Sequence, residues 1–199
     1  MKIKIYFTFI LLGVLNAQLP QDKFQKAKSA LNEINNTTPT YQPPKRMSIK
    51  EATLLAINKI RTSPQICSNP VKPLRWNENL YLVTKEHSID MAVNTFTSHQ
   101  GSGTATDITA RRLRLKRGSY FYERVNQKKN STKILSAELV TAVNKNFYKT
   151  PQEILNYWIK RPKDCKVIMD PRFSDVALSK VISKKNNKAY WTLMLIGKR

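Results

Sequence analysis

The chain has 199 residues and is strongly basic: 35 lysines and arginines against 13 acidic residues give a formal net charge of +22. This charge favours anionic partners such as lipid head groups, lipopolysaccharide, cell-wall polymers or nucleic acid, although a solvated basic surface without a specific partner would also account for it. The basic residues are spread along the chain and form no basic arm, which argues against nucleic acid as the partner.

The first 17 residues have the pattern of a secretory signal peptide. Met1-Lys2-Ile3-Lys4 is a basic start, an apolar run extends from Ile5 to Leu15, and Asn16-Ala17 places a small residue before Gln18. The apolar run is short for a membrane span, no cysteine follows it closely as in a lipoprotein, and no later segment is long enough to cross a bilayer. An uncleaved amphiphilic anchor is the alternative. We therefore expect an exported protein, periplasmic or extracellular, with a charge of about +20 after cleavage.

Residues 18–46 are expected to form a flexible N-terminal segment. Gln, Lys, Asn, Thr and Pro dominate this stretch. A short helix around 24–34 would offer too little apolar surface to fold alone. The folded domain is therefore predicted to span 47–199.

Four helices are expected in this domain. The capping box Ser48-Ile49-Lys50-Glu51 starts the first helix, and Pro64 ends it. The second should cover 77–95 and the third 106–115, and the capping box Thr150-Pro151-Gln152-Glu153 starts the fourth. Apolar stripes mark the faces that should be buried in the first two helices: Ala52, Leu55, Ala56, Ile57 and Ile60, then Leu80, Leu82, Val83, His87, Met91 and Phe96.

Strands are predicted in the middle and at the end of the chain. The β-prone segments are 120–125, 134–143, 176–183 and 189–196, and the last two flank a turn at 184–187 that makes a hairpin. Helices followed by strands indicate an α+β fold rather than alternating βαβ units. The basic segment 111–133 is interpreted as a solvated loop through which the first of these strands passes.

Cys67 and Cys165 are the only cysteines of the chain. In an exported protein they have one way to pair, although two free buried thiols are the alternative. A bridge would connect the loop after the first helix to the loop after the fourth. Closing a loop of roughly a hundred residues would stabilise the fold by up to about 4–5 kcal/mol in the chain-entropy model.

Few polar residues are candidates for chemistry. His87 lies among apolar positions of the second helix, where a packed histidine donating to a backbone carbonyl is the better interpretation. His99 follows a helix end and precedes a Gly-Ser-Gly turn, where side chains often face a cleft. Glu138 is a lone acid within an apolar β-prone segment, and Asp164 precedes Cys165. If His99, Glu138 and Asp164 converge, one imidazole and two carboxylates could bind Zn²⁺ with a fourth position open.

Three elements in order resemble the start of a domain of the CAP superfamily, which includes cysteine-rich secretory, antigen-5 and pathogenesis-related proteins. They are Leu74-Arg75-Trp76-Asn77, His87-Ser88-Ile89-Asp90-Met91 and Ser98-His99-Gln100-Gly101. The resemblance covers about residues 50–199 and is strongest to the secreted bacterial, SCP-like branch. It implies a three-layer α-β-α sandwich with a mostly antiparallel central sheet.

In bacterial members a Ser-His-x-Gly element, a Gly-Glu-Asn-Ile-Ala strand and a Ser-Pro-Gly-His loop bring two histidines and a glutamate into one cleft. Here Ser98–Gly101 matches the first element, 137–141 keeps only Glu138 of the second, and 161–164 keeps the proline of the third but has Asp164 in place of its histidine. A disulfide-bonded subgroup has the pattern His-Cys-x-x-x-Met, with which Cys165 and Met169 agree, and its partner cysteine lies where Cys67 does. Tyr190-Trp191 matches the final strand.

Two functions remain open. The cleft is either degenerate, or altered toward a harder metal or a proton-sharing acid pair. A degenerate cleft indicates a non-enzymatic binding module that acts at the cell envelope, or outside the cell, through its basic surface. An altered cleft indicates a metal-assisted hydrolase with His99 and Asp164 as ligands and Glu138 as ligand or general base. A lipid or sterol groove, known for some relatives, has no specific residue support here. Zinc is the candidate cofactor, and a monomer is expected.

Overall fold

The computed structural model describes residues 21–23, 25–26, 28–29, 47–127 and 134–198. The predicted signal peptide lies outside the described residues. The chain divides into two compact units, Met1–Lys45 and Arg46–Arg199. In the first unit the described residues between 21 and 29 are helical. Within the described ranges, no helix is both long and apolar enough to cross a membrane.

The second unit is built around a four-stranded sheet with the strand order β1-β3-β4-β2. The strands are β1 (Arg75–Trp76), β2 (Leu135–Asn144), β3 (Phe173–Ile182) and β4 (Lys188–Gly197). β4 pairs antiparallel with both β2 and β3, whereas the short β1 runs parallel to β3. The predicted strands 134–143, 176–183 and 189–196 are confirmed, and the sheet is mixed but mostly antiparallel, as expected.

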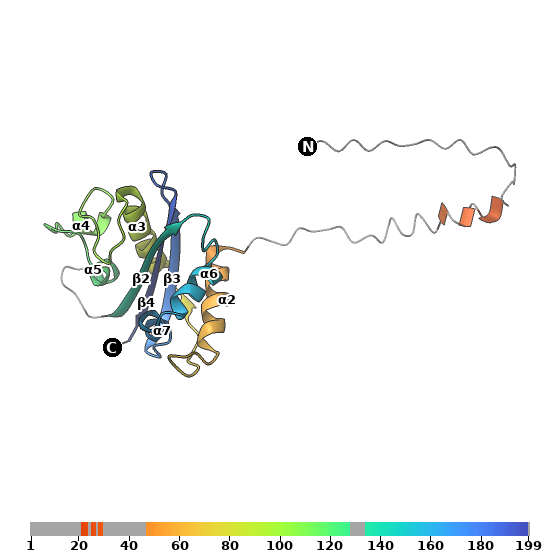
Figure 1. Cartoon of the computed structure of the whole chain (residues 1–199), viewed down its shortest axis with the longest axis horizontal. Helices are drawn as coiled ribbons and strands as arrows, with labels where there is room; N and C mark the ends of the chain where they lie inside the picture. The colour runs from red at the N-terminus through yellow and green to blue at the C-terminus, as the bar shows by residue number, and fades with distance from the viewer. Residues whose placement is uncertain (1–20, 24, 27, 30–46, 128–133, 199) are drawn as a thin grey trace. The chain divides into compact units, whose positions relative to one another are not determined.

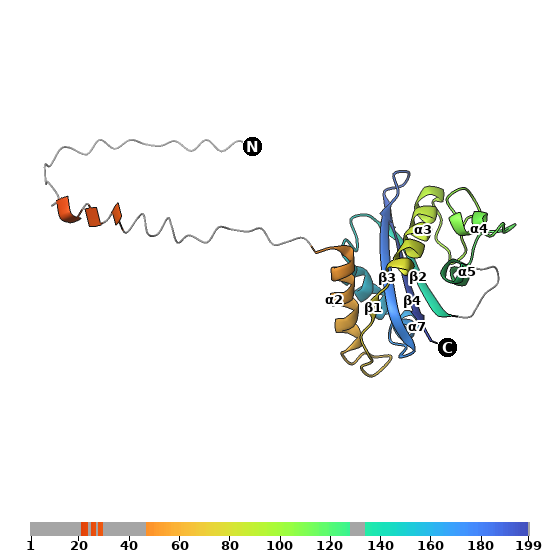
Figure 2. The same cartoon turned by 180° about the vertical axis from the view of Figure 1, so that it is seen from behind.

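Helices cover both faces of this sheet (Figures 1 and 2). One face carries α2 (Ile49–Arg61), α6 (Pro151–Ile159) and α7 (Pro162–Ile168), and α3 (Glu78–Asn94) packs on the other. The short α4 (Ile108–Arg112) and α5 (Phe121–Asn126) lie beside α3. The largest core cluster joins buried side chains of the first face: Ile57, Ile154, Leu155, Trp158, Ile168, Trp191, Leu193 and Leu195. The arrangement is the predicted three-layer α-β-α sandwich.

Helix ends follow the capping signals in the sequence. Ser48 and Thr150 both form capping boxes, and α3 lies between the caps Asn77 and Thr95. The third predicted helix is shorter than expected and covers only α4. Two residues assigned to the buried stripes are exposed instead, Leu55 by 62% and Leu82 by 64%. The faces of α2 and α3 that contact the sheet are therefore narrower than the apolar periodicity indicated.

Two predictions about local structure were wrong. The segment 120–125, predicted as a strand, instead forms the N-cap Tyr120 and most of the helix α5, because the Glu123 side chain accepts a hydrogen bond from the Tyr120 N–H at 2.9 Å and caps the helix there. This local capping outweighs the β preference of the aromatic residues. The second error is that residues 162–168 form α7, with Pro162 in the first turn, instead of a loop. Because α5 lies within it, the described part of the basic segment 111–133 is not one solvated loop.

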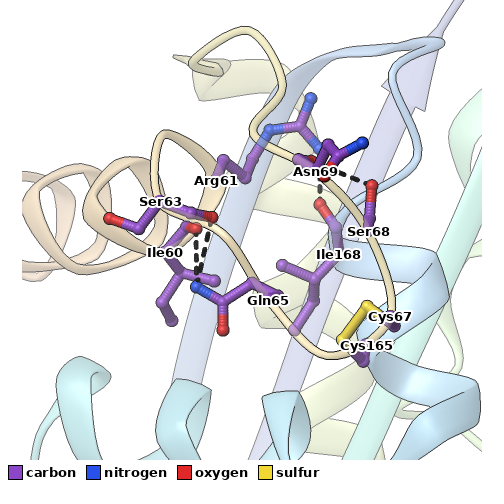
Figure 3. Close-up of a disulfide and its surroundings, with 9 residues drawn as sticks. All are labelled: Ile60, Arg61, Ser63, Gln65, Cys67, Ser68, Asn69, Cys165 and Ile168. Atoms are coloured by element: carbon purple, nitrogen blue, oxygen red, sulfur yellow. Dashed lines mark hydrogen bonds between the residues drawn. A yellow bond between two sulfur atoms is a disulfide. The ribbon is translucent and has the colours of Figure 1, made fainter.

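The predicted disulfide between Cys67 and Cys165 is present and links positions 98 residues apart in the sequence (Figure 3). It connects the loop after α2 to the helix α7, not to a loop as expected. The buried Arg61 side chain fixes the same region, because it donates to the backbone carbonyls of Lys72 at 2.8 Å and Asp170 at 3.1 Å and also to that of Ile168. The loop is thus held by hydrogen bonds as well as by the covalent link.

Candidate functional site

The candidate site centres on Glu138 of β2, whose carboxylate is fully buried. Its Oε1 atom lies 3.0 Å from His99 Nδ1 and 3.9 Å from His87 Nε2, and its Oε2 atom accepts a hydrogen bond from Arg124 Nη2 at 2.9 Å. A buried carboxylate is stable only when it is paired and hydrogen-bonded. Both oxygens of Glu138 meet this requirement within the protein itself.

Arg124 supplies the positive charge that balances this carboxylate. The side chain belongs to α5 and is 1% exposed. Besides Glu138 it donates to the backbone carbonyls of Ser119 at 2.7 Å and His99 at 3.0 Å. Arg124 therefore joins α5, β2 and the His99 loop in one network.

A loop held by two buried aspartates positions His99. Asp90 of α3 accepts hydrogen bonds from the backbone and side chain of Ser102 at 2.8 and 2.5 Å. Asp107 accepts from the backbone and side chain of Ser119 at 2.8 and 2.6 Å. These contacts fix the loop from both sides. Asp90, the acid of the His87–Met91 motif, therefore serves to hold this loop.

Close packing of backbone explains the small residues of this loop. A Cβ atom on Gly101 would lie 2.2 Å from Asp107 Oδ2, and one on Gly118 would lie 1.6 Å from the Gly101 carbonyl oxygen. The Gly101 N–H also donates to the Ser119 carbonyl at 2.7 Å. A side chain at either glycine would therefore push apart two segments. One segment carries His99, and the other carries Ser119, whose carbonyl accepts a hydrogen bond from Arg124.

His87 is a buried core histidine, as predicted. Its Nε2 atom donates to the Ser98 carbonyl at 2.7 Å, and the side chain is 1% exposed. Burial lowers the pKa of His87 and outweighs the raising effect of the nearby Glu138 charge. A neutral ring with its proton on Nε2 fits this hydrogen bond.

The local electrostatics shift the pKa values of His99 and Glu138 in opposite directions. Burial raises the pKa of Glu138, but the charge of Arg124 and the surrounding hydrogen bonds outweigh it and hold that pKa below its ordinary value. The hydrogen bond to Glu138 raises the pKa of His99, against the lowering effect of partial burial. The His99 side chain is 56% exposed, so its ring is the part of the network that solvent reaches.

Asp164 lies at the edge of this network rather than within it. Its Oδ2 atom forms an ion pair with Arg161 Nε at 3.2 Å. Burial raises the pKa of Asp164, while Arg161 and His99 lower it. The structure thus brings His99 and Glu138 into contact, whereas Asp164 acts on His99 through its charge.

The donor set does not fit a metal centre. Among the described residues, no group of three or more His, Cys, Asp or Glu side chains lies close enough to hold a metal ion. The Glu138 oxygens are already bound to Arg124 and His99, and a cation would have to compete with the guanidinium for the same carboxylate. The predicted convergence of His99, Glu138 and Asp164 on one Zn²⁺ is therefore not found in the described part of the chain.

A separate groove of about 730 Å³ lies beside α3. Three of the side chains that line it, Leu82, Ile108 and Ile134, are exposed apolar residues. His99, Glu138 and Asp164 are not among its lining residues. The groove and the Glu138 cluster are therefore two different features of the molecule.

We predict that the imidazole of His99 titrates above its ordinary pKa of 6.5 and that Glu138→Gln lowers this pKa. Because the folded-state pKa is raised, the contact stabilises the fold below pH 6.5, and this contribution is lost as the pH rises through the folded-state pKa. An NMR titration can measure both rings, since the chain has only two histidines. His87 is the internal control and should stay neutral through this range; an unchanged His99 pKa in the variant would contradict the assignment.

The residue that sequence reasoning missed is Arg124. The composition of its segment predicts a solvated charge at this position, but the side chain is buried against Glu138. The one signal that could have revealed it was Glu138 itself, because an acid inside an apolar strand requires a buried cation or donor nearby. Nothing in the spacing indicated which of many basic residues this partner would be.

Comparison with known proteins agrees with this fold. The model of the Cysteine-rich secretory protein family (CAP) matches residues 54–195. An outer surface protein of Borrelia burgdorferi superposes with a TM-score of 0.52 at 13% identity, over 77% of this chain and 97% of that one. An extracellular Bacillus anthracis protein with an SCP domain superposes with a TM-score of 0.51 at 18% identity, over 81% of this chain and 45% of that one. A comparison with curated protein sequences gives no match. The family match spans most of the chain, and the chain therefore belongs to the cysteine-rich secretory protein (CAP) family.

Proposed function

We propose that this protein is an exported, non-enzymatic binding module that engages an anionic component of the cell envelope through its basic surface. The observation that carries the proposal is the pairing of Glu138 with Arg124 at 2.9 Å in the buried cluster. A carboxylate neutralised by a guanidinium is a poor general base and a poor metal ligand, because its lone pairs and its charge are already engaged. The cluster then serves to hold the His99 loop on the sheet.

The distribution of charge supports the same proposal. Four of the acidic residues that the structure describes are buried, namely Asp90, Asp107, Glu123 and Glu138. Among the described residues only two of the basic side chains, Arg61 and Arg124, are buried. Burial therefore removes more negative than positive charge from the surface, and the face that a partner meets is more basic than the composition alone indicates.

Export is supported by the signal-like first 17 residues and by the disulfide, since disulfides persist in oxidising compartments. The two structural neighbours are described as an outer surface protein and an extracellular protein. Fractionation of the producing cells measures how the protein is divided between the periplasm and the medium.

We predict salt-sensitive binding to anionic envelope material. The protein, purified after export from a bacterial host, is mixed with anionic vesicles, lipopolysaccharide or purified cell wall, and the bound fraction is measured by sedimentation. Binding to at least one of them should fall steeply between about 50 and 500 mM salt, because exposed charges are screened within a Debye length of about 10 Å at 0.1 M.

Two results would overturn the proposal. One is the absence of binding to all three materials at low salt. The other is stoichiometric Zn²⁺ binding in calorimetry that both His99→Ala and Asp164→Ala abolish, since this would restore the metal-assisted hydrolase. Lys59→Ala, a change at an exposed lysine of α2, is the control for the titration.

A further inference from the structure

One end of the sheet gathers lysines, and the acid that lies beside them is Glu153 of α6, which accepts from the Lys149 N–H and whose charge acts on Lys180. The stretches 139–152 and 176–198 contain seven lysines and no aspartate or glutamate. Six of these lysines lie where β2 leads into α6 and where the β3–β4 hairpin turns, and two large apolar side chains accompany them. We call this set the hairpin-end surface: Lys145, Phe147, Lys149, Lys180, Ile182, Lys184, Lys185 and Lys188.

Direct contacts hold the two parts of this surface together. The Lys145 N–H donates to the Asn187 carbonyl at 3.0 Å, which joins the end of β2 to the hairpin turn. Lys180 Nζ donates to the Lys149 carbonyl at 3.0 Å, which joins β3 to the segment before α6. The hairpin turn lies at the end of the sheet opposite α7 (Figure 1). The two segments that carry these lysines therefore lie side by side at this end of the sheet.

Phe147 is held in solvent by a well-fixed turn. Its side chain is 65% exposed. Its N–H donates to the Asn144 carbonyl at 2.9 Å, and the next residue, Tyr148, packs on Tyr157 with ring centroids 4.9 Å apart. The turn is anchored on both sides of Phe147, so the exposure of this ring is a property of the fold.

Ile182 is the second exposed apolar side chain of this surface, at 50%. It lies two residues after Lys180 on β3 and therefore on the same face of the strand. Because Lys180 reaches the Lys149 carbonyl, this face is also the one beside the turn that carries Phe147. Two exposed apolar side chains thus belong to the same end of the sheet as the lysines.

We infer that the hairpin-end surface docks on the head-group region of a membrane that contains anionic phospholipid. The inference rests on the proposed function and names its surface and its partner. Lysines near such a membrane gain from its negative surface potential, and exposed apolar side chains gain by entering the boundary between head groups and acyl chains. A cell-wall polymer or lipopolysaccharide sugar would satisfy the lysines but offers no apolar layer for Phe147 and Ile182.

The test measures sedimentation with vesicles of phosphatidylglycerol and phosphatidylethanolamine, and with vesicles of phosphatidylcholine alone. The surface variant replaces Lys145, Lys184, Lys185 and Lys188 by glutamine. A control variant with the same loss of charge replaces four exposed lysines elsewhere: Lys59, Lys72, Lys163 and Lys166. At about fivefold per lysine, the surface variant should bind anionic vesicles a few hundredfold more weakly, whereas the control changes far less.

A second readout reports insertion directly. Phe147→Trp should show a blue shift of fluorescence when anionic vesicles are added. Leu55→Trp, at a position on α2 that is equally exposed, should show none. No shift in Phe147→Trp, together with binding of the unmodified protein to vesicles, would overturn the insertion of this surface.

The outcomes distinguish the two proposals. Equal weakening by the surface and control variants would show that the membrane contact is not at the hairpin-end surface, while the binding function stands. Binding of the unmodified protein only to cell wall or lipopolysaccharide would reject the membrane as partner and leave the proposed function intact. If the unmodified protein binds none of the anionic materials, both the proposed function and the membrane contact are contradicted.

Discussion

Replacing Arg124 by methionine is expected to lower the free energy of unfolding by about 3–5 kcal/mol at neutral pH. The substitution keeps most of the apolar stem but leaves the fully buried Glu138 carboxylate without its cation. It also removes the donors to the Ser119 and His99 carbonyls. Breaking one side of a buried ion pair is far more damaging than removing both, because the remaining charge keeps its desolvation penalty.

The loss should depend on pH in a defined direction. In the unmodified protein the pKa of Glu138 is held below its ordinary value of 4.5, so its contribution to stability is present above pH 4.5 and is lost as the pH falls through the folded-state pKa. In Arg124→Met, burial raises the pKa of Glu138 instead, and the variant is destabilised increasingly as the pH rises above 4.5. The difference between the two proteins should therefore shrink toward acidic pH.

Urea unfolding at pH 7 and at about pH 4.5 measures this effect. Arg112→Met removes an exposed arginine of α4 and is the matched control, with an expected change within about 0.5 kcal/mol. Adding Glu138→Gln to Arg124→Met should restore part of the lost stability, because the uncompensated charge is gone. A loss of stability of less than 1 kcal/mol, or one that is independent of pH, would show that Arg124 does not stabilise the fold by balancing the Glu138 charge.

Removing the disulfide is the second change with a large expected effect. Cys67→Ala together with Cys165→Ala should reduce the free energy of unfolding by about 4 kcal/mol, because the bridge closes a loop of 98 residues and restricts the unfolded chain. The native loop is held independently by Arg61, which donates to the Lys72 carbonyl at 2.8 Å. The double variant should therefore keep its native circular dichroism spectrum while it unfolds at a lower urea concentration.

Unfolding with and without reductant provides the check. Reductant should lower the stability of the unmodified protein to that of the double alanine variant and should leave the variant itself unchanged. Equal stability of the oxidised and reduced protein would contradict the expected role of the bridge. A variant that loses its native spectrum would show instead that Arg61 cannot hold the loop alone.

The altered motif residues acquire a physical explanation from the cluster. Asp164 stands where the resemblance leads one to expect a histidine, and it pairs with Arg161 at 3.2 Å instead of joining Glu138. Glu138 has its charge balanced by Arg124 on the other side. The carboxylates of Asp164 and Glu138 thus do not form the expected acid pair, because each of them is paired with a different arginine.

The sequence by itself determined the features that depend on neighbouring residues or on simple counting. The capping boxes at Ser48 and Thr150 located two helix starts, alternating β-prone segments located three long strands, and two cysteines allowed one pairing. The ordered motifs around His87 and His99 indicated the family. Each of these features can be recognised from a few neighbouring residues or from a residue count, without knowing which distant segments pack together.

Only the tertiary structure decided which charges are buried and which are exposed. Arg124 and the exposed lysines of the hairpin turn are all basic residues in polar stretches, yet one is 1% exposed against Glu138 and the others face solvent. The physical reason is that a charged side chain is buried only where a distant segment brings it a partner, and Arg124 finds Glu138 across the packing of α5 on β2. That contact is made by the fold and has no counterpart in local sequence spacing.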